Sequence, residues 1–152
     1  RATSRMKALN GYTFLWQSQG RSIQRIRRIM YVFRGKITAE TGPVEFTFRD
    51  RNVLLLDAAP DGEALAVKDS VWIDYFTEPL STENMEFIER SGKWTSFDVS
   101  DRAPYSSVID QIIDEVTAIR TPDNKITGTI IKTASNAMRV EVEADEISVD
   151  IA

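Results

Sequence analysis

The sequence predicts an α+β domain made mainly of antiparallel β-sheet, and three observations lead to this prediction. Short runs of β-branched and aromatic residues alternate with turns rich in Gly, Pro, Asn and Asp along most of the chain. One central segment, 81–92, has helix start and stop signals instead. The first and last thirds also share their order of elements. We therefore expect two β-meanders, duplicated or merely similar, with one or two short helices between them.

The length of 152 residues suits a single domain. We expect residues 1–10 to be a flexible N-terminus and residues 11–152 to form one β-rich domain. Within that domain, the halves 22–69 and 108–152 would be the two repeats.

The first half contains five predicted strands separated by turn residues. The stretch at 44–48 (VEFTF) alternates apolar and polar residues, whereas 53–58 (VLLLDA) is apolar on both faces, as a central strand would be. The aromatic run GYTFLWQ and the apolar run within SIQRIRRIMYVFRGK also favour strands. The predicted strands are 11–17, 29–33, 44–48, 53–58 and 64–67.

The middle of the chain mixes both element types. Residues 70–76 (SVWIDYF) predict a strand, and 93–100 predict a strand or an ordered loop. Helix 81–92 would begin at Ser81 and stop at Gly92, with acidic residues in its first turns. Apolar spacing in 104–113 predicts a second helix, whose end toward residue 119 is left open.

The second half repeats the plan of the first. Strands are predicted at 114–120, 126–132, 138–143 and 147–151, and MRVEVE alternates strictly. With a short gap, the halves align so that the following pairs correspond: Asn52 with Asn136, Leu54 with Met138, Leu56 with Val140, and Asp61 with Asp145. Chance similarity stays an alternative to duplication, because alternation and turn residues recur in all meanders.

Composition excludes several chemistries. The chain has no cysteine and no histidine, which removes disulfides, thiolate nucleophiles, histidine-dependent triads and the usual zinc sites. Its net charge of −4 argues against general binding to nucleic acid or anionic membranes. Apolar runs are far shorter than the roughly 20 residues that cross a bilayer. We expect a cytoplasmic protein with no membrane association, no cofactor and no metal.

The basic stretch 22–36 allows two interpretations. Arg25, Arg27, Arg28, Arg34 and Lys36 could line an RNA-binding groove. Alternatively, aligning IRRIMYV with IDEVTAI sets Arg27 and Arg28 against Asp114 and Glu115, so that the arginines would pair with carboxylates across the two halves. In that arrangement Ile26, Ile29 and Val32 would be buried. We favour the structural interpretation and expect nucleic-acid binding to be absent.

Aromatic and acidic residues supply the remaining candidate sites. Any two of Trp16, Trp72 and Trp94 would form a small-ligand or peptide pocket if they line a shared concavity with Tyr75 or Tyr105. Asp74, Asp98 and Asp101 are the candidates for a hydrolytic carboxylate pair or a hard-metal site. With 23 acidic residues in the chain, some must lie near aromatic residues without any such role.

We therefore predict a non-enzymatic interaction module that binds a partner protein, as small bacterial accessory or immunity-type proteins do. Its expected partner-binding residues are Arg25, Arg27, Arg28, Trp72, Tyr75 and Trp94. A homodimer formed through an edge strand is a further arrangement that this prediction allows. A carboxylate-dependent hydrolase or metal binder is the first alternative, and RNA binding through Arg25–Lys36 is the second.

Overall fold

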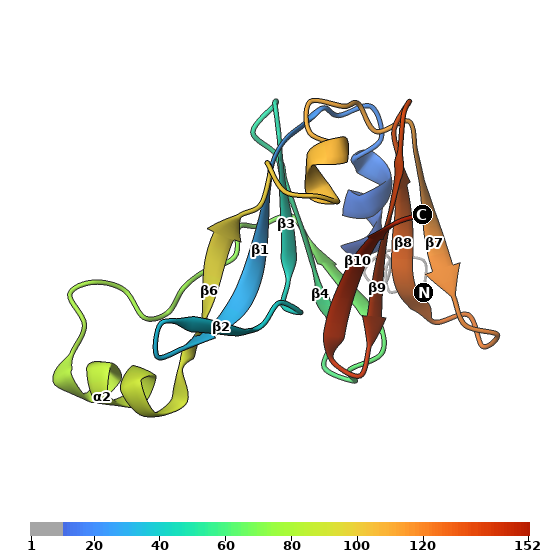
Figure 1. Cartoon of the computed structure of the whole chain (residues 1–152). Helices are drawn as coiled ribbons and strands as arrows, with labels where there is room; N and C mark the ends of the chain where they lie inside the picture. Colours follow the sequence, from blue (N-terminus) through green and yellow to red (C-terminus); the bar gives the residue numbers. More distant parts are fainter. Residues whose placement is uncertain (1–10) are drawn as a thin grey trace.

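A computed structural model describes residues 11–152 as two antiparallel β-sheets with short helices, which confirms the predicted α+β class (Figure 1). The expected flexible N-terminus, residues 1–10, lies outside the described residues. Within residues 11–152, no helix combines the length and apolarity that crossing a membrane requires.

The first sheet is built around one long strand, β1. It contains β1 (Ile23–Phe33), β2 (Lys36–Ala39), β3 (Val44–Phe48), β4 (Val53–Ala58), β5 (Leu65–Lys68) and β6 (Lys93–Asp98). The strand order is β2-β1-β3-β4-β5, and β6 adds to β1 by antiparallel pairing of Arg27–Val32 with Lys93–Asp98. Because β1 is long, its first part pairs with β3 while its later part extends into a hairpin with β2.

The second sheet is a four-stranded meander. It contains β7 (Glu115–Arg120), β8 (Ile126–Lys132), β9 (Ala137–Glu143) and β10 (Glu146–Ile151), in the order β10-β9-β8-β7. Strands 44–48, 53–58 and 126–132 were predicted with the bounds that the structure has. The other three strands of the second sheet differ from prediction by one residue at their first end.

Both sheets contribute to one apolar core. Phe46, Phe48 and Leu56 of the first sheet and Ile131 and Val140 of the second are fully buried in the same cluster. The chain segments entering the two meanders also meet, since Ser22 forms an antiparallel bridge with Ile112. Removal of apolar surface from water on this scale is the main force that stabilises such a fold.

The prediction of a strand at 11–17 is wrong, because these residues are helical. Helical spacing brings Tyr12, Leu15 and Trp16 to one side, and Leu15 is fully buried in the core. The Tyr12 hydroxyl donates a hydrogen bond to the Leu65 carbonyl at 2.9 Å. Packing of one helical face therefore outweighs the β-propensity of the aromatic residues.

The predicted strand at 70–76 is also wrong, and the predicted helix at 104–113 shrinks to a single 3₁₀ turn, Tyr105–Ser107. Residues beyond that turn pair with the start of β1 instead, where the Ile23 amide donates to the Gln111 carbonyl at 3.0 Å. The predicted helix at 81–92 is confirmed as α2 (Thr82–Ser91), with Ser81 as its N-cap and Gly92 as its C-cap.

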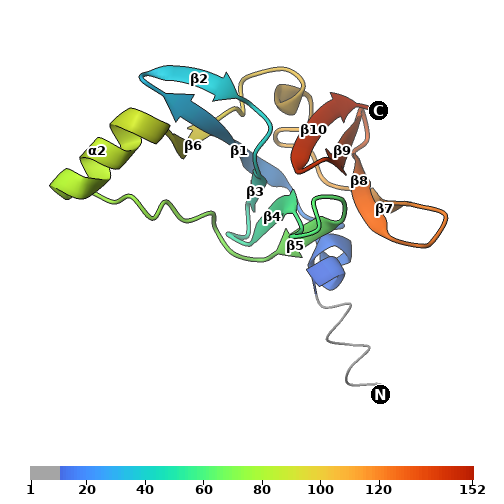
Figure 2. The same cartoon turned by 90° about the horizontal axis from the view of Figure 1, so that it is seen from below.

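The far end of β1, with β2, β6 and α2, projects from the two-sheet body (Figures 1 and 2). Residues 69–81, which we call the connecting segment, join β5 to α2 and contain no helix or strand. Figure 2 shows this segment running past β4 and β3 toward α2 at the far end of the molecule. Two of the predicted partner-binding residues, Trp72 and Tyr75, lie on it.

Candidate functional site

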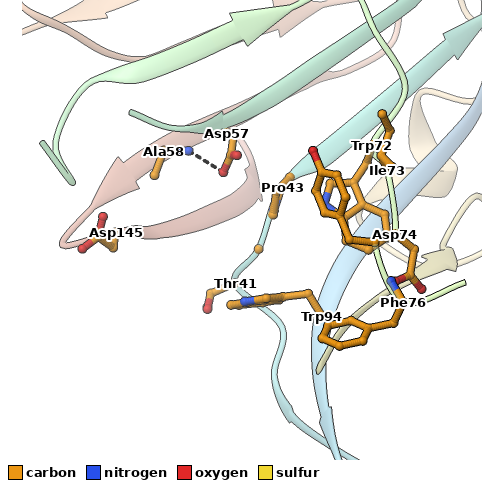
Figure 3. A pocket seen from close by; sticks show the side chains of 12 residues that line it. Thr41, Pro43, Asp57, Ala58, Trp72, Ile73, Asp74, Phe76, Trp94 and Asp145 are labelled. Carbon is orange, nitrogen blue, oxygen red and sulfur yellow. Dashed lines mark hydrogen bonds between the residues drawn. The ribbon is translucent and has the colours of Figure 1, made fainter. Parts of the chain in front are cut away.

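An open cavity of about 430 Å³ lies between the connecting segment and the two sheets (Figure 3). We call it the aromatic pocket. Its walls are Trp72, Tyr75 and Phe76 of the connecting segment and Trp94 of β6, together with residues 41–43, Asp57, Ala58 and Asp145. The volume lies within the range of pockets that bind small ligands or single side chains.

Side-chain hydrogen bonds, rather than a neighbouring strand, fix the connecting segment. The amide of Trp72 donates to Glu45 Oε2 at 2.8 Å, and the amide of Phe76 donates to Asp74 Oδ1 at 2.9 Å. The Lys93 ammonium forms an ion pair with Asp74 at 2.5 Å. These bonds satisfy backbone donors that a β-ladder would otherwise satisfy, which explains why an apolar, β-prone sequence does not form a strand here.

An ion pair between Arg27 and Glu45 holds the pocket residue Trp72 in place. Both oxygens of Glu45, on β3, accept from the Arg27 guanidinium of β1, at 2.6 and 2.7 Å. The Glu45 side chain is fully buried, while 22% of the Arg27 side chain stays exposed. Burial alone would raise the pKa of Glu45, but the bonds from Arg27 and the Trp72 amide outweigh burial and lower it. Glu45 is therefore charged and holds the pocket wall at Trp72.

Trp94 fits against a glycine at the other wall. A side chain on Gly42 would come within 2.8 Å of the Trp94 ring and within 2.3 Å of the Ile29 carbonyl oxygen. The ring also makes an edge-to-face contact with Tyr31, with centroids 5.1 Å apart. Trp94 is nevertheless 41% exposed, so much of its ring remains open to a ligand.

Arg28 fastens the same region to the second half of the chain. Its guanidinium is buried and donates to the Gly42 carbonyl at 3.1 Å, to the Tyr105 hydroxyl at 2.8 Å and to the Ile147 carbonyl. The amide of Ile147 in turn donates to the Thr41 carbonyl at 2.9 Å. Residues 41–43 are thus fixed between β1 and β10.

Two further carboxylates, Asp57 and Asp145, line the side of the pocket away from Trp72 and Trp94, and the Asp145 carboxylate points away from these rings (Figure 3). Asp57, on β4, is partly buried, and burial raises its pKa, although the Ala58 amide and Lys68 act in the opposite direction. Asp145 lies in the β9–β10 turn at φ +66°, and its amide donates to the Gly62 carbonyl at 2.9 Å. Within residues 11–152, neither carboxylate takes part in an ion pair.

The structure brings Trp72, Tyr75 and Trp94 together but separates them from the three predicted arginines. Arg25 lines a different depression, beside Asp98. Arg27 and Arg28 do not line the pocket. Arg27 bonds to Glu45, which accepts from the Trp72 amide, and Arg28 donates to the Gly42 carbonyl.

The predicted pairing of Arg27 and Arg28 with Asp114 and Glu115 is wrong, because Arg27 bonds to Glu45 on β3 and Arg28 bonds to neutral oxygens of Gly42, Tyr105 and Ile147. Ile26 and Ile29 are buried as expected, and Val32 is only partly buried.

The acidic candidates do not gather in one place. Asp74 lines the aromatic pocket, Asp98 lines the separate depression beside Arg25, and Asp101 is exposed in a turn. In the described part of the chain, no three acidic side chains are arranged to hold a metal ion.

Sequence reasoning missed Glu45, Asp57 and Asp145 as parts of this site. Glu45 gave no signal in the sequence, since the alternation of VEFTF places it on the polar face of the strand, whereas the structure buries it. Asp57 gave a signal, because it interrupts the apolar strand VLLLDA. Asp145 lies between the predicted strands 138–143 and 147–151 and gave no signal of its own, because its place at the pocket follows from the tertiary contact between two turns.

Comparison with protein-family models, with curated proteins and with solved structures finds no match for this chain.

Proposed function

We propose that the protein is a non-enzymatic interaction module that binds a partner protein through the aromatic pocket. One observation carries the proposal: three exposed aromatic or aliphatic side chains surround a cavity whose backbone is fixed by buried polar bonds. Tyr75 is 86% exposed, Ile73 55% and Trp94 41%. Such side chains are unfavourable in water unless another surface covers them.

Two properties of these side chains favour protein recognition: several are aromatic, and hydrogen bonds fix the backbone that carries them. Tyrosine and tryptophan dominate the binding free energy of many interfaces, because they bury large areas with few rotatable bonds. The Arg27–Glu45 pair and the Arg28 bonds hold the walls before any partner arrives. Preorganisation of this kind lowers the entropy cost of binding.

RNA binding through Arg25–Lys36 is less well supported than partner binding. Arg27 is neutralised by Glu45, and Arg28 is buried against neutral oxygens. Arg34 lies 3.9 Å from Glu89. A groove for phosphates needs free, aligned cations, and this stretch offers few of them.

A hydrolase centred on Asp74, Asp98 and Asp101 also has less support. Asp74 is paired with Lys93, and Asp98 accepts from the Ser100 amide at a separate depression. The pair of cooperating carboxylates that such an enzyme uses therefore does not come from these residues.

The test is affinity capture from the source cell, followed by reconstitution with the purified partner. Tyr75→Ala is the diagnostic variant, since a side chain this exposed contributes little to folding and its loss should change the free energy of unfolding by less than about 0.5 kcal/mol. We expect it to weaken binding of the purified partner at least about tenfold.

Ile112→Ala is the matched control, because Ile112 is 55% exposed and lies outside the pocket. It should leave the affinity unchanged. Equal affinity for wild type and Tyr75→Ala, or an equal loss in Ile112→Ala, would contradict the proposal.

A further inference from the structure

The aromatic pocket has an unbalanced charge. Of its three carboxylates, Asp74 is paired with Lys93, whereas Asp57 and Asp145 are in no ion pair within residues 11–152. Asp57 is also partly buried, where a lone negative charge is costly, and burial raises its pKa accordingly. One side of the pocket is thus prepared for a positive charge.

The opposite side of the pocket suits the same ligand. Trp72, Phe76 and Trp94 lie across the cavity from Asp57 and Asp145 (Figure 3). Aromatic faces attract cations through their quadrupole, most strongly for tryptophan, and arginine is the side chain that most often stacks on them. Lys93 already shows this contact, with its ammonium 5.9 Å from the centre of the Phe76 ring.

Asp145 lies in a strained hairpin turn. Ala144 and Asp145 form the two-residue β9–β10 hairpin loop at φ +50° and +66°, a conformation that normally selects Asn-Gly. The Asp145 carboxylate lies so close to Gly62 that a side chain added there would come within 2.9 Å of it. Strain of this kind is frequently retained where a side chain must be aimed.

We infer that the aromatic pocket recognises a basic side chain of the partner protein, with an arginine as the best fit. Its guanidinium would donate to Asp57 while its plane stacks on the ring of Trp72 or Trp94, and the negative charge of Asp145 would attract it from the edge of the pocket. This inference rests on the proposed function and names the chemistry that the pocket would recognise. The net charge of −4 would further favour a basic partner segment at long range.

The probe that tests the charge is a short peptide of glycine and serine with one central arginine. Its control is the same peptide with citrulline, which keeps the shape and loses the charge. Binding is followed by the indole N–H signals in NMR spectra. Trp72 and Trp94 report on the pocket, and Trp16, in the helical segment 11–17, is an internal reference.

We expect the arginine peptide to shift the Trp72 and Trp94 signals, to leave Trp16 unchanged, and to bind about tenfold more tightly than the citrulline peptide. Asp57→Asn and Asp145→Asn should each weaken the arginine peptide about tenfold and leave the citrulline peptide unaffected. Asp150→Asn, on the exposed face of edge strand β10, is the matched control and should change neither.

Equal binding of the two peptides, or no shift of Trp72 and Trp94 up to the solubility limit, would overturn the inference. So would a preference for neutral oligosaccharides in the same assay, or self-association of the protein through this pocket. If the purified partner needs Tyr75 but not Asp57 or Asp145, partner binding stands and cation recognition fails. If it needs none of them, the proposed function fails as well.

Discussion

At the scale of single residues, the Arg27–Glu45 pair has the clearest energetic role. A carboxylate with no solvent exposure is tolerated because it accepts from both the guanidinium and the Trp72 amide. Pairs of this kind need not exceed an apolar pair in stability, yet loss of one partner leaves the other charge buried and uncompensated.

We therefore expect Arg27→Gln to lower the free energy of unfolding by about 3 kcal/mol, measured by urea denaturation. The double variant Arg27→Leu with Glu45→Leu should recover most of this loss, since no buried charge remains. Lower stability in the double variant than in Arg27→Gln would contradict this account of the pair.

In the strained hairpin turn, a substitution is expected to raise the free energy of unfolding. Glycine adopts the φ of +50° found at Ala144 without a steric penalty. We expect Ala144→Gly to raise the free energy of unfolding by about 0.5–1 kcal/mol, measured by the same denaturation. A fall in stability would show that the turn is not strained at this residue.

Residue roles were the least predictable level from sequence. Trp72, Tyr75 and Trp94, which the sequence singled out, line one pocket, and their part in binding stays a prediction. The sequence could not assign Arg27 and Arg28, since register in a sheet decides which carboxylate or carbonyl a strand residue meets, and Glu45 lies opposite Arg27 on the neighbouring strand.

At the scale of elements, the turn between β4 and β5 links the two halves. Asp61 accepts from the amides of Ala64 and Glu63, both at 2.9 Å, and lies 3.2 Å from the Lys125 ammonium in the β7–β8 turn. These bonds hold the pKa of Asp61 at about 2.

Because this pKa is below the roughly 3.9 of an unfolded Asp, the charged form stabilises the fold above about pH 4 and this contribution is lost as the pH falls toward 2. Urea denaturation of wild type and Asp61→Asn should therefore give a stability difference that is constant above about pH 4 and shrinks below it. A difference that grows on acidification would contradict the assignment.

Helix α2 is attached to the rest of the molecule by few contacts. None of its residues is buried, and Phe87 stacks on Phe76 of the connecting segment with centroids 5.8 Å apart. We expect Phe87→Ala to change the global free energy of unfolding by less than about 0.5 kcal/mol and to speed amide hydrogen exchange across Thr82–Ser91. A loss of more than about 2 kcal/mol would show that α2 belongs to the core.

Elements were predicted well where local signals agreed with tertiary contacts. Helix α2 has both capping residues in its sequence. Strands β3 and β9 alternate apolar and polar residues, and β4 is a continuous apolar run broken only by Asp57. The predicted strand 70–76 was wrong because the Trp72 amide bonds to the Glu45 side chain and not to a neighbouring strand. The predicted helix 104–113 was wrong because its residues include Asp110, whose positive φ is incompatible with a helix.

At the scale of the whole molecule, the two meanders meet at corresponding places. In their hairpin turns, the Asn52 carbonyl accepts from the Phe48 amide and the Asn136 carbonyl accepts from the Thr133 amide. The aligned apolar residues of the two halves are all buried, namely Leu54, Leu56, Met138 and Val140. The turns bearing Asp61 and Asp145 also touch, through Gly62. These correspondences agree with the duplication hypothesis, which stays a prediction.

The pocket depends on this joint arrangement. Its aromatic residues come from the connecting segment and from β6, while Asp57 comes from the first half and Asp145 from the second half. No local sequence signal links these parts, because their proximity follows from how the two sheets pack. The pocket was predictable as a set of aromatic residues and unpredictable as a cavity with two carboxylates that form no ion pair within residues 11–152.

The most direct test of partner binding through the aromatic pocket is amide hydrogen exchange of the protein alone and in complex with its purified partner. We predict that binding slows exchange at the amides of Thr41 and Gly42, in the connecting segment around 72–76 and at Trp94. Exchange in the outer strand β7 should be unchanged. Protection confined to α2, to β7 or to the edge of β10, with the connecting segment unaffected, would contradict the account.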